Sequence, residues 1–310
     1  MKRRVGAWLF GGSVPVVALA AGLLYAPDIP VDSLLPRYAS ARSQFLEIGG
    51  ARIHVRDEGR RDGSILMLLH GSSGSLHVWE GWTQRLGDTF RIVSLDLPGH
   101  GLTGPWPRDD YSIGAYADLT MQVADRLKLE QFAVGGHSMG GAVAWTIATR
   151  RPERITHLVL VGAAAYPRDD AAPIALRVAR TPLLGELNAY FKPRWMVERG
   201  LRETYADPAR LSAARIDRHY ELLRRAGNRA ATLRRLRTAA PLDPSPLASL
   251  NLPTLILWGT RDRWVPPIDA ARLQRDIAGS ELVFYQDTGH ALMEETPDRS
   301  AAAVRRFLMQ

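Results

Sequence analysis

The stretch that decides the fold of this 310-residue chain is Val134–Gly141, which reads VGGHSMGG. It stands between a short apolar run and a stretch with helical spacing. A Gly-x-Ser-x-Gly at such a strand-to-helix reversal predicts a sharp turn that lifts the hydroxyl of Ser138 clear of a sheet. Gly136 and Gly140 suit that turn because a side chain at either position would collide with neighbouring backbone. The N–H groups at the start of the helix would point to the same place, where they stabilise negative charge.

Short apolar runs alternate with helical stretches through most of the chain, which is typical of parallel β-α units. An alternating pattern around Gly49-Gly50 predicts an antiparallel hairpin ahead of them. The predicted parallel strands cover residues 65–69, 91–95, 131–134, 157–161, 254–258 and 281–285. The predicted helices cover residues 112–127, 140–150, 266–277 and 297–308. The sequence therefore predicts an α/β protein whose catalytic body spans 43–310.

Residues 163–249 do not continue this alternation of strands and helices, because they contain amphipathic helical segments but no strand-like run. They predict a helical cap over the sheet. Its aromatic and apolar residues are expected either to line an apolar acyl pocket above Ser138 or only to hold the cap helices together. The residues singled out for the pocket are Tyr190, Phe191, Trp195 and Met196.

A Gly-Ser loop, His70–Gly74, follows the strand predicted at 65–69 and can curl back toward Ser138. A negatively charged tetrahedral intermediate needs two converging N–H donors. The backbone N–H groups of Ser72 and Met139 are the expected pair, and the Ser72 hydroxyl is expected to be an ordinary loop group.

Two further residues complete the chemistry that a serine nucleophile requires, namely a base and an acid that orients it. Asp262 lies four residues beyond the strand predicted at 254–258, and His290 lies just beyond the next strand. Asp96 and Asp287 compete for the role of the acid, but Asp96 is interpreted as a turn-forming residue and Asp287 lies in the turn itself. The sequence thus predicts Ser138 as nucleophile, His290 as general base and Asp262 as its acid.

Together these motifs resemble the α/β-hydrolase superfamily, as do Asp96–Gly101 (DLPGHG) and Trp258–Asp262 (WGTRD). The resemblance implies an eight-stranded, mostly parallel sheet with a helical cap inserted after the sixth strand. It also implies chemistry without a cofactor and a small-molecule ester or other acyl substrate. Haloalkane dehalogenases and epoxide hydrolases use an aspartate at the position of Ser138, which argues against both. A tryptophan typically follows the nucleophile in enzymes similar to proline iminopeptidases, where this chain has Met139.

Several activities remain open on the same three residues. A carboxylic-ester hydrolase is favoured, and a cofactor-free haloperoxidase or perhydrolase is its close relative. Carbon–carbon bond hydrolases of aromatic-ring degradation commonly have an aromatic residue after the catalytic histidine, and Ala291 stands there. A ligand-binding receptor that retains a hydrolase pocket is the non-enzymatic alternative. All of these readings involve a pocket for a small molecule.

Composition excludes other classes of site. The chain has no cysteine, which removes disulfides, a thiolate nucleophile and cysteine-rich metal sites, and no metal is expected. The net charge of +8 raises the question of anionic partners. Arginines crowd residues 168–237, but no nucleic-acid motif accompanies them, so solvated helix faces are the interpretation and no nucleic acid is expected.

The N-terminus predicts a membrane segment. Lys2-Arg3-Arg4 precede an uncharged run from Val5 to Ala26 that is long enough for a helix to span a bilayer. Residues 1–26 are therefore expected to anchor the protein in the membrane with the catalytic domain exported. Cleavage after Ala18-Leu19-Ala20, giving a secreted protein, is the alternative. Residues 27–42, rich in proline, are interpreted as a linker.

Overall fold

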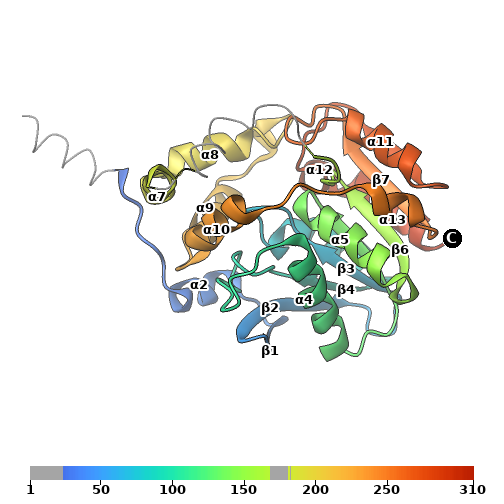
Figure 1. Cartoon of the computed structure of the whole chain (residues 1–310), viewed down its shortest axis with the longest axis horizontal. Helices are drawn as coiled ribbons and strands as arrows, with labels where there is room; N and C mark the ends of the chain where they lie inside the picture. The colour runs from blue at the N-terminus through green and yellow to red at the C-terminus, as the bar shows by residue number, and fades with distance from the viewer. Residues whose placement is uncertain (1–23, 168–180, 182) are drawn as a thin grey trace, which may run out of the picture.

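The computed structural model describes residues 24–167, 181 and 183–310, whose strands form an eight-stranded sheet (Figure 1). The strands are β1 (Ser43–Ile48), β2 (Ala51–Gly59), β3 (Ile65–Leu69), β4 (Arg91–Leu95), β5 (Phe132–His137), β6 (Ile155–Val161), β7 (Thr254–Gly259) and β8 (Glu281–Tyr285). Their order is β1-β2-β4-β3-β5-β6-β7-β8. β2 pairs antiparallel with β1 and β4, and every other pair is parallel. The predicted α/β architecture is confirmed.

Helices cover both faces of the sheet, as α/β folds require when central strands are buried throughout. One face packs against α4 (Ile113–Arg126), α5 (Met139–Arg150) and α11 (Ile268–Asp276). The opposite face packs against α3 (Glu80–Leu86), α12 (Leu292–Glu295) and α13 (Pro297–Leu308). The parallel strands thus direct their carboxyl ends toward one edge of the sheet, where polar loops gather.

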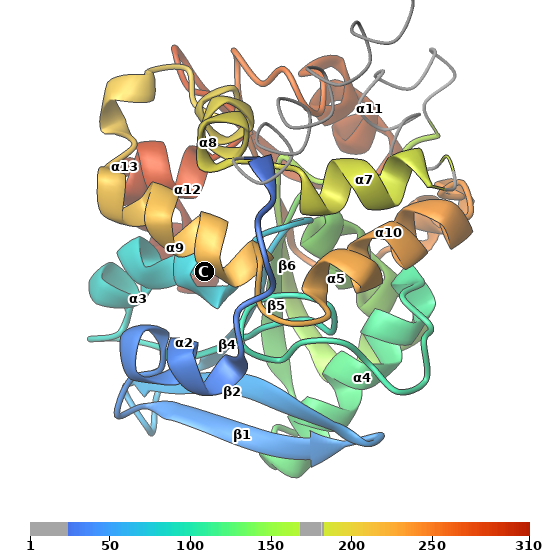
Figure 2. The ribbon, with the colours of Figure 1, turned by 90° about the vertical axis from the view of Figure 1, so that its left-hand side faces the viewer.

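A cap of helices leaves the sheet after β6 and returns at β7, as predicted (Figure 2). Its helices are α7 (Leu184–Tyr190), α8 (Arg194–Arg202), α9 (Ala213–Leu223) and α10 (Asn228–Thr238). The side chain of Ser212 caps α9 by accepting the N–H of Arg215. The cap meets the sheet where β8 ends, because the N–H of Ala291 donates to the carbonyl of Thr204 at 3.0 Å.

The segment interpreted as a linker, 27–42, is an ordered part of the fold. It contains α2 (Val31–Tyr38) and passes beside the cap helices before it reaches β1 (Figure 2). Backbone hydrogen bonds join Ile29 to Arg224 and Ala226 at 2.8 and 2.9 Å. The hydroxyl of Tyr38 donates to Glu221 of α9 at 2.6 Å. Residues 26–38 therefore connect the cap to the sheet domain.

The expectation of a membrane anchor is corrected. Within residues 24–167, 181 and 183–310, no helix is long and apolar enough to cross a bilayer. The run on which the prediction rests, Val5 to Ala26, lies outside the described residues as far as Leu23. No described helix therefore supports a membrane-anchored location with an exported catalytic domain. The same holds for the membrane as a partner.

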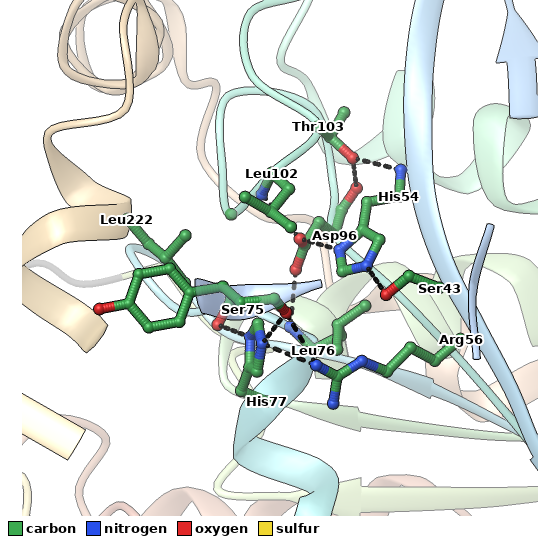
Figure 3. A network of polar contacts seen from close by, with 12 residues as sticks. Ser43, His54, Arg56, Ser75, Leu76, His77, Asp96, Leu102, Thr103 and Leu222 are labelled. Carbon is green, nitrogen blue, oxygen red and sulfur yellow. Dashed lines mark hydrogen bonds and ion pairs between the residues drawn. The ribbon is translucent and has the colours of Figure 1, made fainter. Parts of the chain in front are cut away.

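A buried polar network holds the loops that follow β3 and β4 in place (Figure 3). Its centre is Asp96, which accepts the imidazole N–H of His54 at 2.7 Å and the backbone N–H groups of Leu76 and Leu102 at 2.7 and 2.8 Å. Burial alone would raise the pKa of Asp96, but the neighbouring His54, together with His77 and His70, outweighs it and holds that pKa below its usual value. Asp96 is thus a structural anion, in keeping with its interpretation as a residue of the turn.

Replacement of Asp96 tests this network. We expect Asp96→Asn to lower the free energy of unfolding by about 3–5 kcal/mol, because an amide cannot replace the charge or accept all three hydrogen bonds. Urea denaturation measures the loss, and Asp62→Asn is the control because its partner Arg60 and Asp62 itself are both exposed. Equal stability of the two variants would contradict the central role of Asp96.

The same network makes stability depend on pH through His77. Its Nε2 lies 2.9 Å from the carbonyl of Tyr38. Burial lowers the pKa of His77 to about 4; Arg218 and Arg56 act in the same direction, and Asp96 and Glu80 oppose them. An unfolded histidine titrates near pH 6.5, so the unfolded state binds the extra proton between pH 6.5 and 4.

We therefore expect the free energy of unfolding to decrease as pH falls from 6.5 to about 4, with His77 responsible for up to about 3 kcal/mol. Denaturation curves at pH 7 and pH 4.5 check this. His77→Gln should be less stable at pH 7 but should lose less on acidification. An identical loss in both proteins would assign the pH dependence to other groups.

Candidate active site

Ser138 occupies the reversal between β5 and α5 and has a strained backbone, with φ 53° and ψ −116°. A conformation of this kind costs about 1–3 kcal/mol and persists only when the surroundings enforce it. The close packing of backbone around Gly136 and Gly140 shows how the surroundings hold this conformation. A side-chain carbon on Gly136 would lie 2.0 Å from the carbonyl oxygen of Gly140, and one on Gly140 would lie 2.2 Å from that of Leu69. Only glycine allows this turn at both positions.

Hydrogen bonds attach the reversal to the end of β6. The N–H of Ser138 donates to the carbonyl of Val161 at 3.0 Å, and its carbonyl accepts the N–H of Ala164 at 3.0 Å. Met139 is the first residue of α5, where backbone N–H groups have no acceptor within the helix. The structure thus places the N–H of Met139 beside Ser138, as the predicted oxyanion hole requires.

Asp262 and His290 meet across the ends of β7 and β8. The Nδ1 of His290 lies 2.7 Å from Oδ2 of Asp262, so the imidazole N–H donates to the carboxylate. The other oxygen, Oδ1, accepts the N–H groups of Trp264 and Val265 at 2.8 and 2.9 Å. Both partners are buried, at 6% exposure each. The carboxylate is therefore fixed in position, and it fixes the orientation of the imidazole.

Gly162, directly after β6, leaves room for this pair. Its φ is +49°, and a side-chain carbon there would lie 3.2 Å from Nδ1 of His290 and 3.3 Å from Oδ2 of Asp262. Because Ser138 is hydrogen-bonded to Val161, the neighbour of Gly162, the pair of Asp262 and His290 lies near the reversal at Ser138. Asp287, the other acid weighed in the turn, instead pairs with Arg261 on the surface.

The loop after β3 approaches the reversal closely. A side-chain carbon on Gly71 would lie 3.1 Å from Cβ of Ser138. The buried imidazole of His70 holds this loop: its Nδ1 donates to the carbonyl of Gly71 at 2.7 Å, and its Nε2 accepts the N–H of Leu97 at 3.0 Å. Burial lowers the pKa of His70, which keeps this neutral arrangement. Ser72, the second predicted oxyanion donor, is the next residue.

His137 contributes more than the sequence indicated. Its ring packs on that of His290 with a centroid distance of 4.4 Å. Its Nε2 donates to the carbonyl of His290 at 3.0 Å. Burial, together with the proximity of His290, lowers the pKa of His137 well below its usual value. A neutral His137 thus supports the backbone of His290, a role for which the sequence carries no signal.

The four cap residues chosen for an acyl pocket make their contacts elsewhere. Tyr190 packs under the guanidinium of Arg229, and Phe191 packs against Tyr25. Trp195 and Met196 are exposed, at 61% and 36%. Among the described residues, the structure gives no contact between these four and Ser138, Asp262 or His290.

A small pocket lies between the cap and the loop after β3. Polar side chains line it from both sides, and the half-buried carboxyl of Glu294 accepts the hydroxyl of Tyr205 at 3.0 Å. Burial raises the pKa of Glu294. No cluster of three or more metal-binding side chains occurs in the part of the chain that the structure describes. The residues that line the pocket are Gly74, Ser75, His77, Val78, Leu201, Tyr205, Leu211, Arg215, Arg218, His219 and Glu294.

This geometry agrees with a family assignment. The model of the alpha/beta hydrolase fold family matches residues 64–297, which is most of the chain and includes the reversal, Asp262 and His290. The chain belongs to the α/β-hydrolase fold family. Its chemistry is accordingly that of a hydrolase.

Known members of the family resemble the chain over most of its length. A 2-hydroxy-6-oxononadienedioate/2-hydroxy-6-oxononatrienedioate hydrolase of Klebsiella pneumoniae is 29% identical over 293 residues, which is 89% of this chain and 99% of the relative. The crystal structure of Cfl2 from Burkholderia cenocepacia is 26% identical with a TM-score of 0.76, covering 86% of this chain and 95% of Cfl2. A thermophilic esterase from Thermogutta terrifontis is 27% identical with a TM-score of 0.71, covering 84% and 93%.

Gly162→Ala tests the space around the acid and the histidine. We expect the methyl group to displace one partner by a few tenths of an ångström and to lower kcat by roughly 10-fold, less than the roughly 100-fold that a misplacement of about 1 Å can cost. Gly279→Ala is the matched control, because its φ of +72° imposes similar backbone strain and no atom lies within 4 Å. Both variants should lose similar stability, but only Gly162→Ala should lose activity toward a 4-nitrophenyl ester. Normal turnover by Gly162→Ala would show that the pair is not needed in this geometry.

Proposed function

We propose that the protein is a serine hydrolase that cleaves a carboxylic ester through an acyl-enzyme on Ser138. The observation that carries the proposal is the 2.7 Å hydrogen bond between Asp262 and His290, next to a serine held in a strained turn. A serine hydroxyl is a weak nucleophile until a base of this kind removes its proton. The similarity to a thermophilic esterase supports the choice of an ester.

In this mechanism His290 takes the proton of Ser138 as the serine oxygen attacks the ester carbonyl carbon. Asp262 stabilises the resulting imidazolium through Nδ1. The tetrahedral oxyanion accepts hydrogen bonds from the backbone N–H groups of Ser72 and Met139. When the carbon–oxygen bond breaks, His290 protonates the departing alcohol. Water then attacks the acyl-enzyme, His290 takes its proton, and the carboxylic acid leaves as the proton returns to Ser138.

Three substitutions test the roles. Ser138→Ala and His290→Ala should each reduce kcat/KM for 4-nitrophenyl butyrate by about 10³-fold or more, and Asp262→Asn should have an effect of the same order. Asp287→Asn is the control: this exposed aspartate also lies near His290 in sequence but pairs with Arg261, and it should retain near-normal activity. Substantial turnover by Ser138→Ala would exclude the mechanism, and a large loss in Asp287→Asn alone would identify a different acid.

A carbon–carbon bond hydrolase is the second candidate, favoured by the similarity to the Klebsiella pneumoniae enzyme. The same residues would act on a ketone carbonyl, and the adjacent carbon–carbon bond would break in place of the ester bond. Ala291 follows His290 at the position where such enzymes commonly have an aromatic residue. The two candidates differ in substrate and not in the expected effect of Ser138→Ala.

Parallel assays separate the two candidates. The full-length protein is given 4-nitrophenyl esters from acetate to palmitate and, separately, a 2-hydroxy-6-oxo-dienoate ring-fission product. A higher kcat/KM with an ester supports the first proposal, and a higher value with the ring-fission product supports the second. Stoichiometric labelling of Ser138 without turnover of either substrate would indicate a ligand-binding receptor.

A further inference from the structure

We propose that Arg235, on cap helix α10, binds a carboxylate group of the substrate beside the oxyanion hole. This inference rests on the proposed function, since it assigns a substrate class to the same site. A guanidinium Nη2 of Arg235 donates to the hydroxyl of Ser72. Ser72 follows Gly71, whose Cα hydrogen faces Cβ of Ser138 closely enough that a side-chain carbon there would lie at 3.1 Å. The guanidinium therefore binds the residue that directly follows Gly71, and Gly71 approaches Ser138 closely.

Among the described residues, Arg235 differs from the other three arginines of α10 in having no carboxylate partner. Arg234 pairs with Asp109 at 2.9 Å, Arg237 with Glu186 at 2.9 Å, and Arg229 with Asp28. Among the residues that the structure describes, Arg235 has only the neutral hydroxyl of Ser72. Its Nε is buried and has no hydrogen-bond partner. An uncompensated cation with a buried, unpaired donor is costly unless an anion completes it.

In the part of the chain that the structure describes, the one ionisable acid that acts on Arg235 is the phenol of Tyr116. The neighbouring hydroxyl of Tyr116 already donates to the carbonyl of Pro98 at 3.0 Å. Burial, with the proximity of His70 and then of Arg235, lowers the pKa of His100 well below its usual value. Nδ1 of this neutral His100 donates to Pro98, and its buried Nε2 has no partner. Two buried nitrogen atoms, one donor and one acceptor, are thus unpaired in the same part of the structure.

The chemistry of the pair defines the ligand. The guanidinium presents planar N–H donors that match the two oxygens of a carboxylate, and Nε and Nη2 lie on the same edge of that plane. Bonding to Ser72 leaves Nε for the ligand, and a second donor of the fork remains available to it. We therefore expect the preferred substrate to carry a carboxylate in addition to the bond that is cleaved, on either the acyl or the alcohol side.

Matched ester pairs test this in the full-length protein. Mono-4-nitrophenyl glutarate is compared with 4-nitrophenyl valerate, which has the same acyl chain length without the carboxylate. For the alcohol side, 4-carboxyphenyl butyrate is compared with its methyl ester. The variants are Arg235→Gln and Arg235→Lys, with Arg234→Gln as the control because Arg234 lies on the same helix but is exposed and paired with Asp109.

The wild type should prefer the charged member of at least one pair. Arg235→Gln should lower kcat/KM for that member by roughly 10- to 100-fold, the effect expected for a lost charged hydrogen bond, and should change the neutral member by less than about threefold. Arg235→Lys should restore part of the preference, and Arg234→Gln should retain all of it. The pair that responds identifies the side of the ester that carries the carboxylate.

Two results would overturn the proposal. One is the absence of any preference for a charged member in the wild type. The other is an equal loss on charged and neutral members in Arg235→Gln, which would mean that Arg235 only positions the Ser72 loop. Failure of the catalytic mechanism is recognised separately, because Ser138→Ala would then turn over both members of each pair.

Discussion

The rest of the active site depends on how closely three backbone segments approach one another at Ser138. The strained serine is tolerated because its N–H and carbonyl are both hydrogen-bonded at the end of β6, and because glycines occupy the positions where side chains would collide. This packing holds Ser138 directly before α5, so that the first N–H groups of the helix lie next to it in the chain. Gly71 and Gly162 extend the same condition to the neighbouring loops, so that the oxyanion loop and the acid–histidine pair can approach without displacing the turn.

Burial assigns different tasks to histidines that the sequence alone does not distinguish. Ser43, His54 and Asp96 form a hydrogen-bonded series with distances of 2.7 Å, which resembles a catalytic arrangement in composition. Asp96, however, also holds two backbone N–H groups, and His54 is completely buried, so this series supports loops. The pair of Asp262 and His290 differs because it lies at the carboxyl ends of β7 and β8, near the strained turn at Ser138. Environment, more than residue type, separates the buried series of Ser43, His54 and Asp96 from the candidate catalytic pair.

Much of the fold could be predicted because buried parallel strands are continuous apolar runs and because the Gly-x-Ser-x-Gly turn has few structural uses. Asp262 and His290 follow from their positions after strands. The cap was harder, because apolar residues there can face solvent, as Trp195 does, and only the packing shows it. Arg235 is one of several arginines on α10, and no sequence pattern shows that it alone faces Ser72. The prolines of residues 27–42 favoured a linker over the helix α2 that the structure has. Leu34 and Tyr38 nevertheless have the spacing of one buried helix face.

The N-terminal segment has a mechanical consequence. It is bonded to the cap through Ile29 and Tyr38, and to the sheet side because Arg56 donates to the carbonyl of Tyr38 at 2.9 Å. This segment therefore fastens the cap to the sheet domain in addition to the two chain crossings and to direct contacts such as that between Ala291 and Thr204. A chain shortened to begin at Ser43 would lose this fastening and would uncover Leu102 and Leu222, which pack against α2. A pulling force on residues 26–38 would likewise reach the cap through these hydrogen bonds. The motion of the cap relative to the sheet therefore depends on a part of the chain that is remote from Ser138 in sequence.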